Sequence, residues 1–226
     1  MKPRIPIEQT TTFTRLPLDL VEHDGRYTLE SGGTLVAAQN WENPAIELME
    51  MICQPFRPAK QPRLIFLGLG FGHAIKAARH FLPQEKASFV IFPEAEVLPN
   101  WIEKHLPESP IDDGHNRVHL ETLSPFRPIP AEYAKSQAVI MDHDHLLALS
   151  PGSYDPTHPT SLHNIYDSLK VGGLLGIIGS RLDDALKKRL QKCGFEVAHE
   201  FVPLSEKSKK NRTIYLARKG HYRGNR

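Results

Sequence analysis

Three glycines in five residues, Gly68-Leu69-Gly70-Phe71-Gly72, form the strongest candidate for a ligand-binding loop in this sequence. The stretch follows an apolar run at residues 64–67 and precedes a helical pattern. Glycine lets the backbone turn tightly, and its missing side chain lets a ligand come close. The next helix directs its N-terminus at the loop, where anionic or polar groups are stabilised. We therefore expect Gly68, Leu69, Gly70 and Gly72 to bind a cofactor. A tight strand-to-helix turn without a ligand is the alternative.

Two acidic residues, Glu94 and Glu96, follow the second apolar run at residues 87–92. A carboxylate at this position can accept hydrogen bonds from the ribose hydroxyls of a nucleoside ligand. Acidic residues are also favoured at a helix N-terminus by the helix dipole alone. Glu94 is nearer the end of the run, so it is the candidate ribose contact.

Four titratable residues, Asp142-His143-Asp144-His145, follow the apolar run at residues 138–141. Ligands of open α/β sheets bind outside the carboxyl ends of the strands. Asp142 and Asp144 are therefore the candidate catalytic residues, since either could orient or deprotonate an amine nucleophile. A polar loop at a strand end is the alternative. We expect no metal site, because no third ligand stands at a characteristic spacing and an extended segment would alternate its side chains between faces.

Alternating strands and helices are predicted to position these residues. The apolar runs are typical of strands buried on both faces of a sheet, and amphipathic helical patterns separate them. This alternation predicts βαβ units and a doubly wound, mostly parallel sheet. The predicted strands are 64–67, 87–92, 138–141 and 174–178, with a weaker one at 117–120, and the predicted helices are 74–82, 97–106 and 161–169.

The two ends of the chain depart from this alternation. Near the N-terminus, residues 27–38 predict a hairpin with a Gly-Gly turn, followed by a helix with Asn43 as N-cap and Pro44 at its first position. Near the C-terminus, a helix opened by Ser180-Arg181-Leu182-Asp183 runs to Cys193 and is followed by strands at 195–202 and 212–217. These last strands predict an antiparallel hairpin. The predicted domains are a small N-terminal hairpin and helix region, 1–57, and a Rossmann-like domain, 58–226.

The composition of the 226 residues is that of a globular protein, with 40% hydrophobic and 24% charged residues. No apolar run reaches the roughly 18–20 residues of a membrane span, and no secretory pattern follows the first residues. The only cysteines, Cys53 and Cys193, do not form a disulfide framework. We therefore expect a cytoplasmic protein. Charge is unevenly distributed along the chain. Residues 181–226 hold 13 Lys/Arg against 5 Asp/Glu, which gives +8, and the other 180 residues have a charge of −6, so the net charge is +2.

These segments together resemble the spermidine synthase-like branch of the class I S-adenosylmethionine-dependent methyltransferases, from about Gly25 to Lys219. The loop at 63–72 is similar to the cofactor loop of that family, and 89–98 to its acidic second strand. Residues 138–144 are similar to its fourth strand and catalytic aspartate segment. The stretches 166–175 and 211–218 are similar to its fifth and last strands.

The resemblance implies a Rossmann-like class I methyltransferase fold: a mostly parallel seven-stranded sheet with a terminal antiparallel hairpin, plus a small N-terminal β-hairpin region. It implies S-adenosylmethionine or its decarboxylated form as cofactor, with Gly68, Gly70 and Gly72 around it and Glu94 on its ribose. Asp142 and Asp144 would face the transferred group. The expected partner is a small-molecule acceptor, an amine among the candidates because the body of the chain is acidic. A homodimer is expected, and no membrane partner.

Three functions follow from these features. The first is group transfer from the sulfonium, with methyl transfer ahead of aminopropyl transfer to a polyamine, because residues 46–49 lack the Tyr-His pair of spermidine synthases. The second is a non-catalytic ligand- or partner-binding member, suggested by Phe92 and by Ser124-Pro125, which replace residues of the family's cofactor site. The third is RNA methylation that uses the basic segment Lys207-Ser208-Lys209-Lys210 on phosphates, although no RNA-recognition aromatic signature is present.

Overall fold

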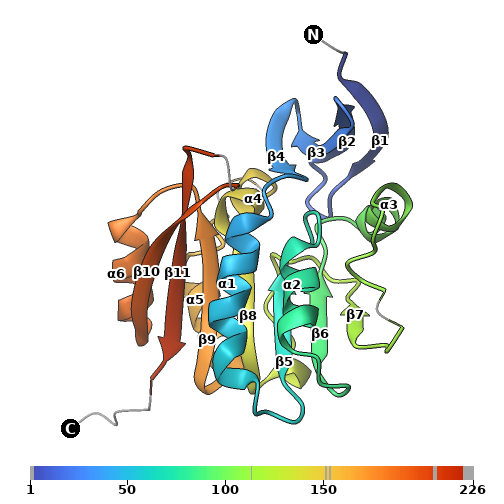
Figure 1. The fold of residues 1–226 in the computed structure, drawn as a ribbon. Helices are drawn as coiled ribbons and strands as arrows, with labels where there is room; N and C mark the ends of the chain where they lie inside the picture. The colour runs from blue at the N-terminus through green and yellow to red at the C-terminus, as the bar shows by residue number, and fades with distance from the viewer. Residues whose placement is uncertain (1–2, 113, 151, 153, 206–207, 221–226) are drawn as a thin grey trace, which may run out of the picture.

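The computed structural model describes residues 3–112, 114–150, 152, 154–205 and 208–220, and it contains two β-sheets (Figure 1). The smaller sheet is antiparallel, in the order β1-β2-β3-β4. Its strands are β1 (Ile5–Thr11), β2 (Pro17–His23), β3 (Arg26–Ser31) and β4 (Thr34–Ala38). The predicted hairpin is the β3–β4 half, whose turn has positive φ at both Gly32 and Gly33, as a two-residue hairpin turn of the I′ type requires. Two earlier strands extend this hairpin into a four-stranded sheet.

The larger sheet has seven strands in the order β10-β11-β9-β8-β5-β6-β7. The five central and outer strands β9, β8, β5, β6 and β7 are parallel, and β11 joins β9 in the antiparallel sense, as β10 joins β11. The predicted mostly parallel sheet with a terminal antiparallel hairpin is therefore confirmed. Its strands are β5 (Arg63–Leu67), β6 (Ser88–Phe92), β7 (Val118–Leu120), β8 (Ser136–Asp142), β9 (Leu169–Gly179), β10 (Phe195–Pro203) and β11 (Asn211–Lys219).

Helices cover both faces of the larger sheet, so its central strands are apolar on both sides. Along β5, Leu64 and Phe66 contribute to one buried cluster and Ile65 and Leu67 to the other, because successive side chains of a strand point to opposite faces. The first cluster packs under α1, α2 and α3, and the second under α5 and α6. The helices are α1 (Asn43–Cys53), α2 (His73–Phe81), α3 (Leu98–His105), α4 (His143–Ala148), α5 (Pro159–Ser168) and α6 (Asp184–Lys192), with short 3-10 turns at Gln54–Phe56 and Ala131–Tyr133.

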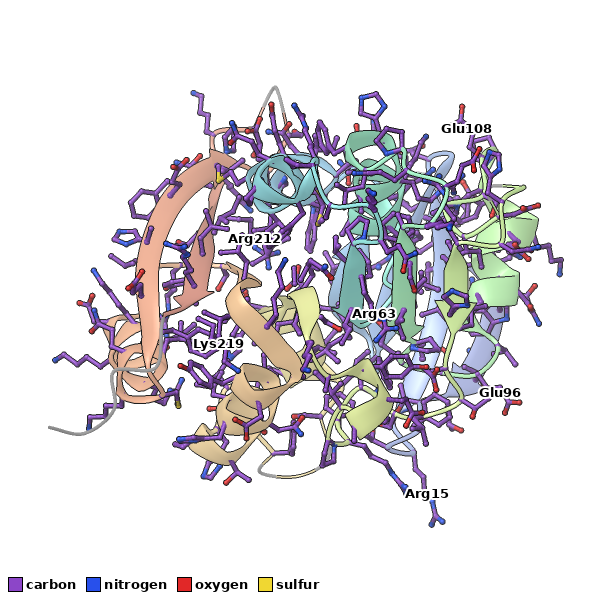
Figure 2. All side chains as sticks on the ribbon, turned by 90° about the horizontal axis from the view of Figure 1, so that it is seen from below. Arg15, Arg63, Glu96, Glu108, Arg212 and Lys219 are labelled. Atoms are coloured by element: carbon purple, nitrogen blue, oxygen red, sulfur yellow. The ribbon has the colours of Figure 1, made fainter. Side chains whose placement is uncertain are left out.

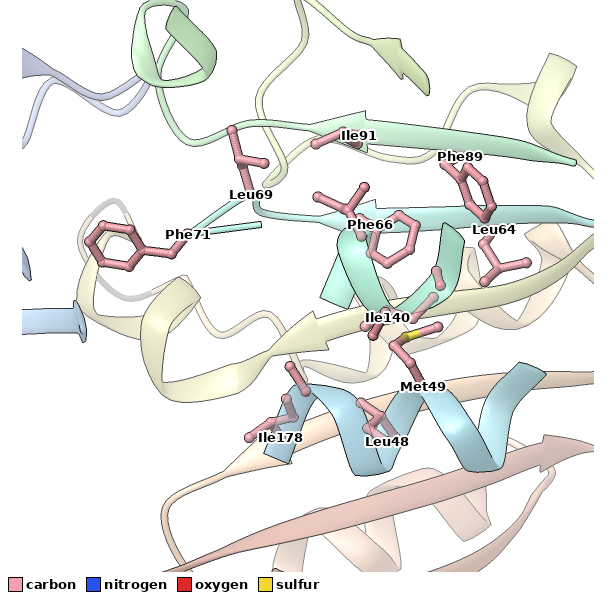
Figure 3. Packing of buried hydrophobic residues seen from close by; sticks show 14 of the residues in the cluster. Leu48, Met49, Leu64, Phe66, Leu69, Phe71, Phe89, Ile91, Ile140 and Ile178 are labelled. Carbon is pink, nitrogen blue, oxygen red and sulfur yellow. The ribbon is translucent and has the colours of Figure 1, made fainter. Parts of the chain in front are cut away.

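Helix α1 comes from the N-terminal region but packs against the larger sheet. Figure 3 shows Leu48 and Met49 facing Ile140 and Ile178 of the strands β8 and β9. The sheet makes room for it at Gly176, where a Cβ atom would overlap Ile52 Cδ1 and lie 3.0 Å from a methyl group of Leu48. The domain boundary after residue 57 stays a prediction, since the buried cluster that α1 joins also includes residues of the small sheet.

Three local predictions differ from the structure. Helix α1 has Glu42 as its N-cap residue, so Asn43 is already helical and its side chain donates to the carbonyl of Pro203. Helix α6 begins at Asp184, and its cap is Asp183, whose Oδ1 accepts hydrogen bonds from two backbone N–H groups of the first turn. Residues 143–148 form the short helix α4 and not an extended segment, because the side chain of Asp142 caps it.

None of the helices within the described residues is both long and apolar enough to cross a lipid bilayer.

Candidate functional site

A cavity of about 100 Å³ lies at the carboxyl ends of β5 and β8. The chain passes from β5 outward to β6 and β7 and then returns to β8 on the other side of β5, so the strand order reverses at this point. Such a switch point is where open α/β sheets bind their ligands. Five of the predicted site residues line the cavity: Gly68, Leu69, Gly70, Glu94 and Asp142.

The glycine loop serves two different neighbours. Gly68 has a φ of +99°, and a Cβ atom there would lie 3.0 Å from Glu94 Oε1, so its missing side chain lets the carboxylate approach the loop. Gly72 has a φ of +74°, and a Cβ atom there would overlap the ring of Pro110. Gly72 does not line the cavity, so packing against Pro110 accounts for it. Leu69 and Phe71 also line the cavity, and their side chains belong to the buried core.

Glu94 is completely buried beneath this loop, at 0% exposure. Its Oε2 accepts the backbone N–H of Leu69 at 2.9 Å and its Oε1 that of Gly70 at 3.0 Å. His145, also buried, forms an ion pair with Oε1 from the first turn of α4. The acidic residue after β6 therefore ties three parts of the site together: the loop, the end of β6 and the start of α4.

The pKa values of this pair shift in the directions that keep both groups charged. Burial by itself raises the pKa of Glu94, but the attraction of His145 and the hydrogen bonds from the loop outweigh it, and the pKa lies below the ordinary glutamate value. Burial by itself lowers the pKa of His145, but Glu94 outweighs it, and the pKa lies above the ordinary histidine value. A carboxylate has about four acceptor sites, and the N–H groups of Leu69 and Gly70, the backbone N–H of Glu94 itself and the ring of His145 engage all four. The contact of Glu94 with a ribose stays a prediction.

Asp142 and Asp144 both lie against Arg212, the second residue of β11. Arg212 Nη2 donates to Asp142 Oδ1 at 2.8 Å and to Asp144 Oδ2 at 3.2 Å. Asp142 Oδ1 also accepts the backbone N–H of His145 at 3.1 Å. The same oxygen takes both hydrogen bonds, and among the described residues no hydrogen bond engages Oδ2 of Asp142. Oδ2 of Asp142 is therefore available to accept a hydrogen bond from a ligand in the cavity.

Asp144 points away from the glycine loop into a second cavity, of about 560 Å³, between the end of β9, α4 and α6. Burial raises its pKa, but His143 and Arg212 outweigh that effect, so the pKa lies below the ordinary aspartate value. The hydrogen bond with Asp144 raises the pKa of His143 above its ordinary value. The structure thus places the two predicted aspartates in different cavities, although both accept hydrogen bonds from Arg212.

His73 lines the first cavity and carries a buried polar atom without a hydrogen-bond partner in the described part of the chain. It is the first residue of α2, and its Nε2 is buried with no hydrogen-bond partner among the described residues. Burial lowers its pKa, so the ring is neutral near pH 7. A buried polar group without a partner is costly, and a ligand hydroxyl or amine would satisfy it.

Three further lining residues were not among the predicted site residues: Trp41, His145 and Arg212. The sequence places Arg212 only in the last strand. Nothing local indicates that the topology brings it next to Asp142, which lies 70 residues earlier in the chain. For His145 a signal did exist, because an aspartate three residues before it is a standard N-cap that turns the histidine inward.

The remaining predicted features have no role in this cavity. Among the residues that the structure describes, no group of three or more His, Cys, Asp or Glu side chains could hold a metal ion. Within the basic segment at 207–210, Lys207 lies outside the described residues, and Lys209 and Lys210 are exposed. Ser124 caps its own turn by accepting the backbone N–H of Phe126 at 3.3 Å.

No family model and no curated protein sequence matches this chain. Solved structures do match its fold. The spermidine synthase of Thermotoga maritima is 14% identical over 95% of this chain and 73% of that one, with a TM-score of 0.68. A spermidine synthase in complex with the transition-state analogue AdoDATO is 15% identical over 95% and 72%, with a TM-score of 0.67. The precorrin-6y C5,15-methyltransferase of Geobacter metallireducens is 16% identical over 76% and 87%, with a TM-score of 0.53.

At these identities the likeness shows the fold and leaves the reaction open. The two spermidine synthases align along nearly the whole chain, whereas the methyltransferase aligns over 76% of it. The chain has the spermidine synthase-like form of the class I S-adenosylmethionine-dependent methyltransferase fold, as the sequence resemblance predicted.

Proposed function

We propose that this protein is an S-adenosylmethionine-dependent methyltransferase that acts on a small-molecule acceptor. One observation carries the proposal: the glycine loop, Glu94 and Asp142 converge on a single cavity at the switch point of a methyltransferase fold. Bound S-adenosylmethionine supplies a methyl group on a sulfonium that is activated for in-line transfer to a nucleophile, so positioning is the main task of the protein.

The residues of the cavity fit such a ligand in their hydrogen-bonding character. The buried Nε2 of His73 lacks a partner, and the backbone at Gly68 and Gly70 has no side chain to hinder close approach. Oδ2 of Asp142 can accept a hydrogen bond from an N–H or O–H group of the methyl acceptor. Asp142 is held by Arg212 and by α4, so its role is to orient the acceptor.

The size of the cavity sets a condition on this proposal. About 100 Å³ is below the roughly 300–1,000 Å³ that ligand pockets occupy, so the cavity has to widen to admit an adenosyl group. Part of the cavity wall is formed by Ala37, Ala38 and Trp41, from the end of β4 and its connection to α1. We expect this connection, which belongs to no helix or strand at Trp41, to be the part that yields.

Calorimetric titration of the full chain with S-adenosylmethionine and S-adenosylhomocysteine tests the proposal. We expect both to bind, and expect Gly70→Val to abolish binding because its side chain would enter the cavity. Gly33→Val is the matched control: Gly33 has a φ of +77°, like the +52° of Gly70, but its side chain would meet open space in a turn outside the cavity. The control carries the same kind of backbone strain and should bind normally. No heat of binding at millimolar ligand contradicts the proposal.

A second function, ligand or partner binding without catalysis, is favoured by the ion pairs that already engage Glu94, Asp142 and Asp144. Transfer of the labelled methyl group of S-adenosylmethionine to a panel of small amines and alcohols separates the two. Binding without transfer to any acceptor would favour the non-catalytic member, and transfer would exclude it. Aminopropyl transfer is the third possibility, and the charges of the cavity bear on it.

A further inference from the structure

Arg212 lies inside the cavity although it belongs to the antiparallel end of the sheet. It is 8% exposed, and in Figure 2 it lies within the outline of the molecule, whereas Arg15 and Glu96 project at the rim. Its Nε donates to the carbonyl of Gly179 at 3.2 Å, and its Nη2 donates to both aspartates. These contacts fix the guanidinium at the end of the cavity where Asp142 stands.

Two of its five N–H donors remain for a ligand. Among the described residues no hydrogen bond engages Nη1, which carries two of them. The guanidinium carbon also lies 6.0 Å from the centre of the Trp41 ring, so the indole covers one face of it. A planar fork with free N–H groups is suited to a carboxylate.

The ionisable side chains that line the cavity sum to no net charge. The negative charge of Glu94 is matched by His145, and that of Asp142 by Arg212, while burial keeps His73 neutral. Asp144, the second partner of Arg212, lines the other cavity, where it also pairs with His143. A site for a polycation needs an excess of negative charge, because like charges repel strongly where water is excluded. This cavity has no such excess of negative charge. Its arginine, Arg212, still has two N–H groups that no described residue engages.

We propose that Arg212 is a specificity-determining residue, which selects a carboxylate-bearing sulfonium over a decarboxylated one and excludes polyamine acceptors. This inference rests on the proposed function. S-adenosylmethionine carries a sulfonium, an ammonium and a carboxylate, whereas its decarboxylated form carries the two cations alone. Arg212 attracts the carboxylate of the first and repels the doubly charged second. The transferred group is then methyl and not aminopropyl.

The test compares the affinities of S-adenosylmethionine and its decarboxylated form by calorimetry at one salt concentration. For the wild-type chain we expect the first to bind at least about tenfold more tightly. Arg212→Met should bring the ratio to about one, and Arg212→Lys, which keeps the charge and loses the fork, should leave an intermediate ratio. Arg189→Met is the matched control, because Arg189 pairs with Asp155 beside the second cavity, and it should keep the wild-type ratio.

The outcomes separate this inference from the proposed function. Equal affinities in the wild-type chain, or a ratio that Arg212→Met leaves unchanged, overturn the role of Arg212 while the proposed function stands. Binding of neither ligand overturns both. The wild-type ratio needs no variant, so a variant that fails to fold does not remove the test. Putrescine titrated into the chain saturated with S-adenosylhomocysteine should give no heat of binding, and micromolar binding would also count against the inference.

Discussion

Two groups of carboxylates and cations lie at the candidate site but differ in their access to water. The Glu94 and His145 side chains are 0% and 6% exposed, whereas Asp142 and Asp144 are 34% and 37% exposed around Arg212, which is 10% exposed. A buried charge that loses its partner cannot turn to water, so the first group has one stable arrangement. The exposed aspartates can exchange a protein partner for water or a ligand at little cost. One wall of the cavity is therefore rigid, and the other can adapt to what binds.

The largest effect should come from removing the cation of the buried pair. His145→Leu leaves the Glu94 carboxylate without its partner, and we expect the free energy of unfolding to fall by about 3–5 kcal/mol. Urea denaturation measures this loss. His143→Leu, in the same helix, is the matched control, because its partner Asp144 can turn to water, and it should cost clearly less. Equal losses for the two variants would remove the distinction between the rigid and the adaptable wall.

A smaller effect should appear with pH. The pKa of His145 is raised by Glu94 in the folded state, so its contribution to stability is fully present below the unfolded histidine value of 6.5. That contribution is lost as the pH rises through the folded pKa. The pKa of Glu94 is lowered, so its contribution is lost only in acid, as the pH falls through a folded value below 4.5. We expect the free energy of unfolding to decline above neutral pH in the wild-type chain.

Urea denaturation between pH 6 and 9 follows this decline. His143 contributes in the same direction, because Asp144 raises its pKa too. The decline should therefore persist in His143→Leu and be much reduced in His145→Leu. If the decline in the free energy of unfolding vanished in His143→Leu, the pH dependence would come from His143 and Asp144 and not from the buried pair of Glu94 and His145.

The smallest effect should come from the adaptable wall itself. Asp144→Asn removes one of two carboxylates from Arg212, while Asp142 keeps its hydrogen bond to the guanidinium at 2.8 Å. Since Asp144 is partly in water, we expect the free energy of unfolding to change by at most about 1 kcal/mol. Thermal and urea denaturation measure the change. A loss of several kcal/mol would show that the aspartates are as rigidly held as Glu94.

The fold could be predicted from the sequence because it depends on local patterns. The apolar runs that became β5, β6, β8 and β9 are buried on both faces, and the double glycine at 32–33 has the positive φ angles of a hairpin turn. The wrong prediction for the start of α6 also has a local cause. Ser180 and Asp183 both suit the N-cap position, and the structure uses Asp183.

The partners of the site residues could not be predicted, because the topology decides them. Glu94 and His145 are separated by about fifty residues, and they meet only because β6 and β8 flank β5 in the sheet. The three glycines of the loop look equivalent in the sequence. In the structure Gly68 and Gly70 line the cavity, with Gly68 also accommodating a carboxylate, whereas Gly72 accommodates Pro110. Spacing alone does not distinguish a glycine that admits a ligand from one that admits a proline.

The fit of α1 against Gly176 has a consequence for how the protein is made. Leu48 and Ile52 pack where Gly176 lacks a side chain, yet about 120 residues of chain separate the helix from that strand. At roughly 5–20 residues per second, a ribosome needs on the order of 6–25 s to synthesise them. During that interval the part of α1 that packs at Gly176 has no strand to cover it, although β5 and β8 are already present. We expect these apolar side chains of the nascent chain to stay uncovered until β9 has been synthesised.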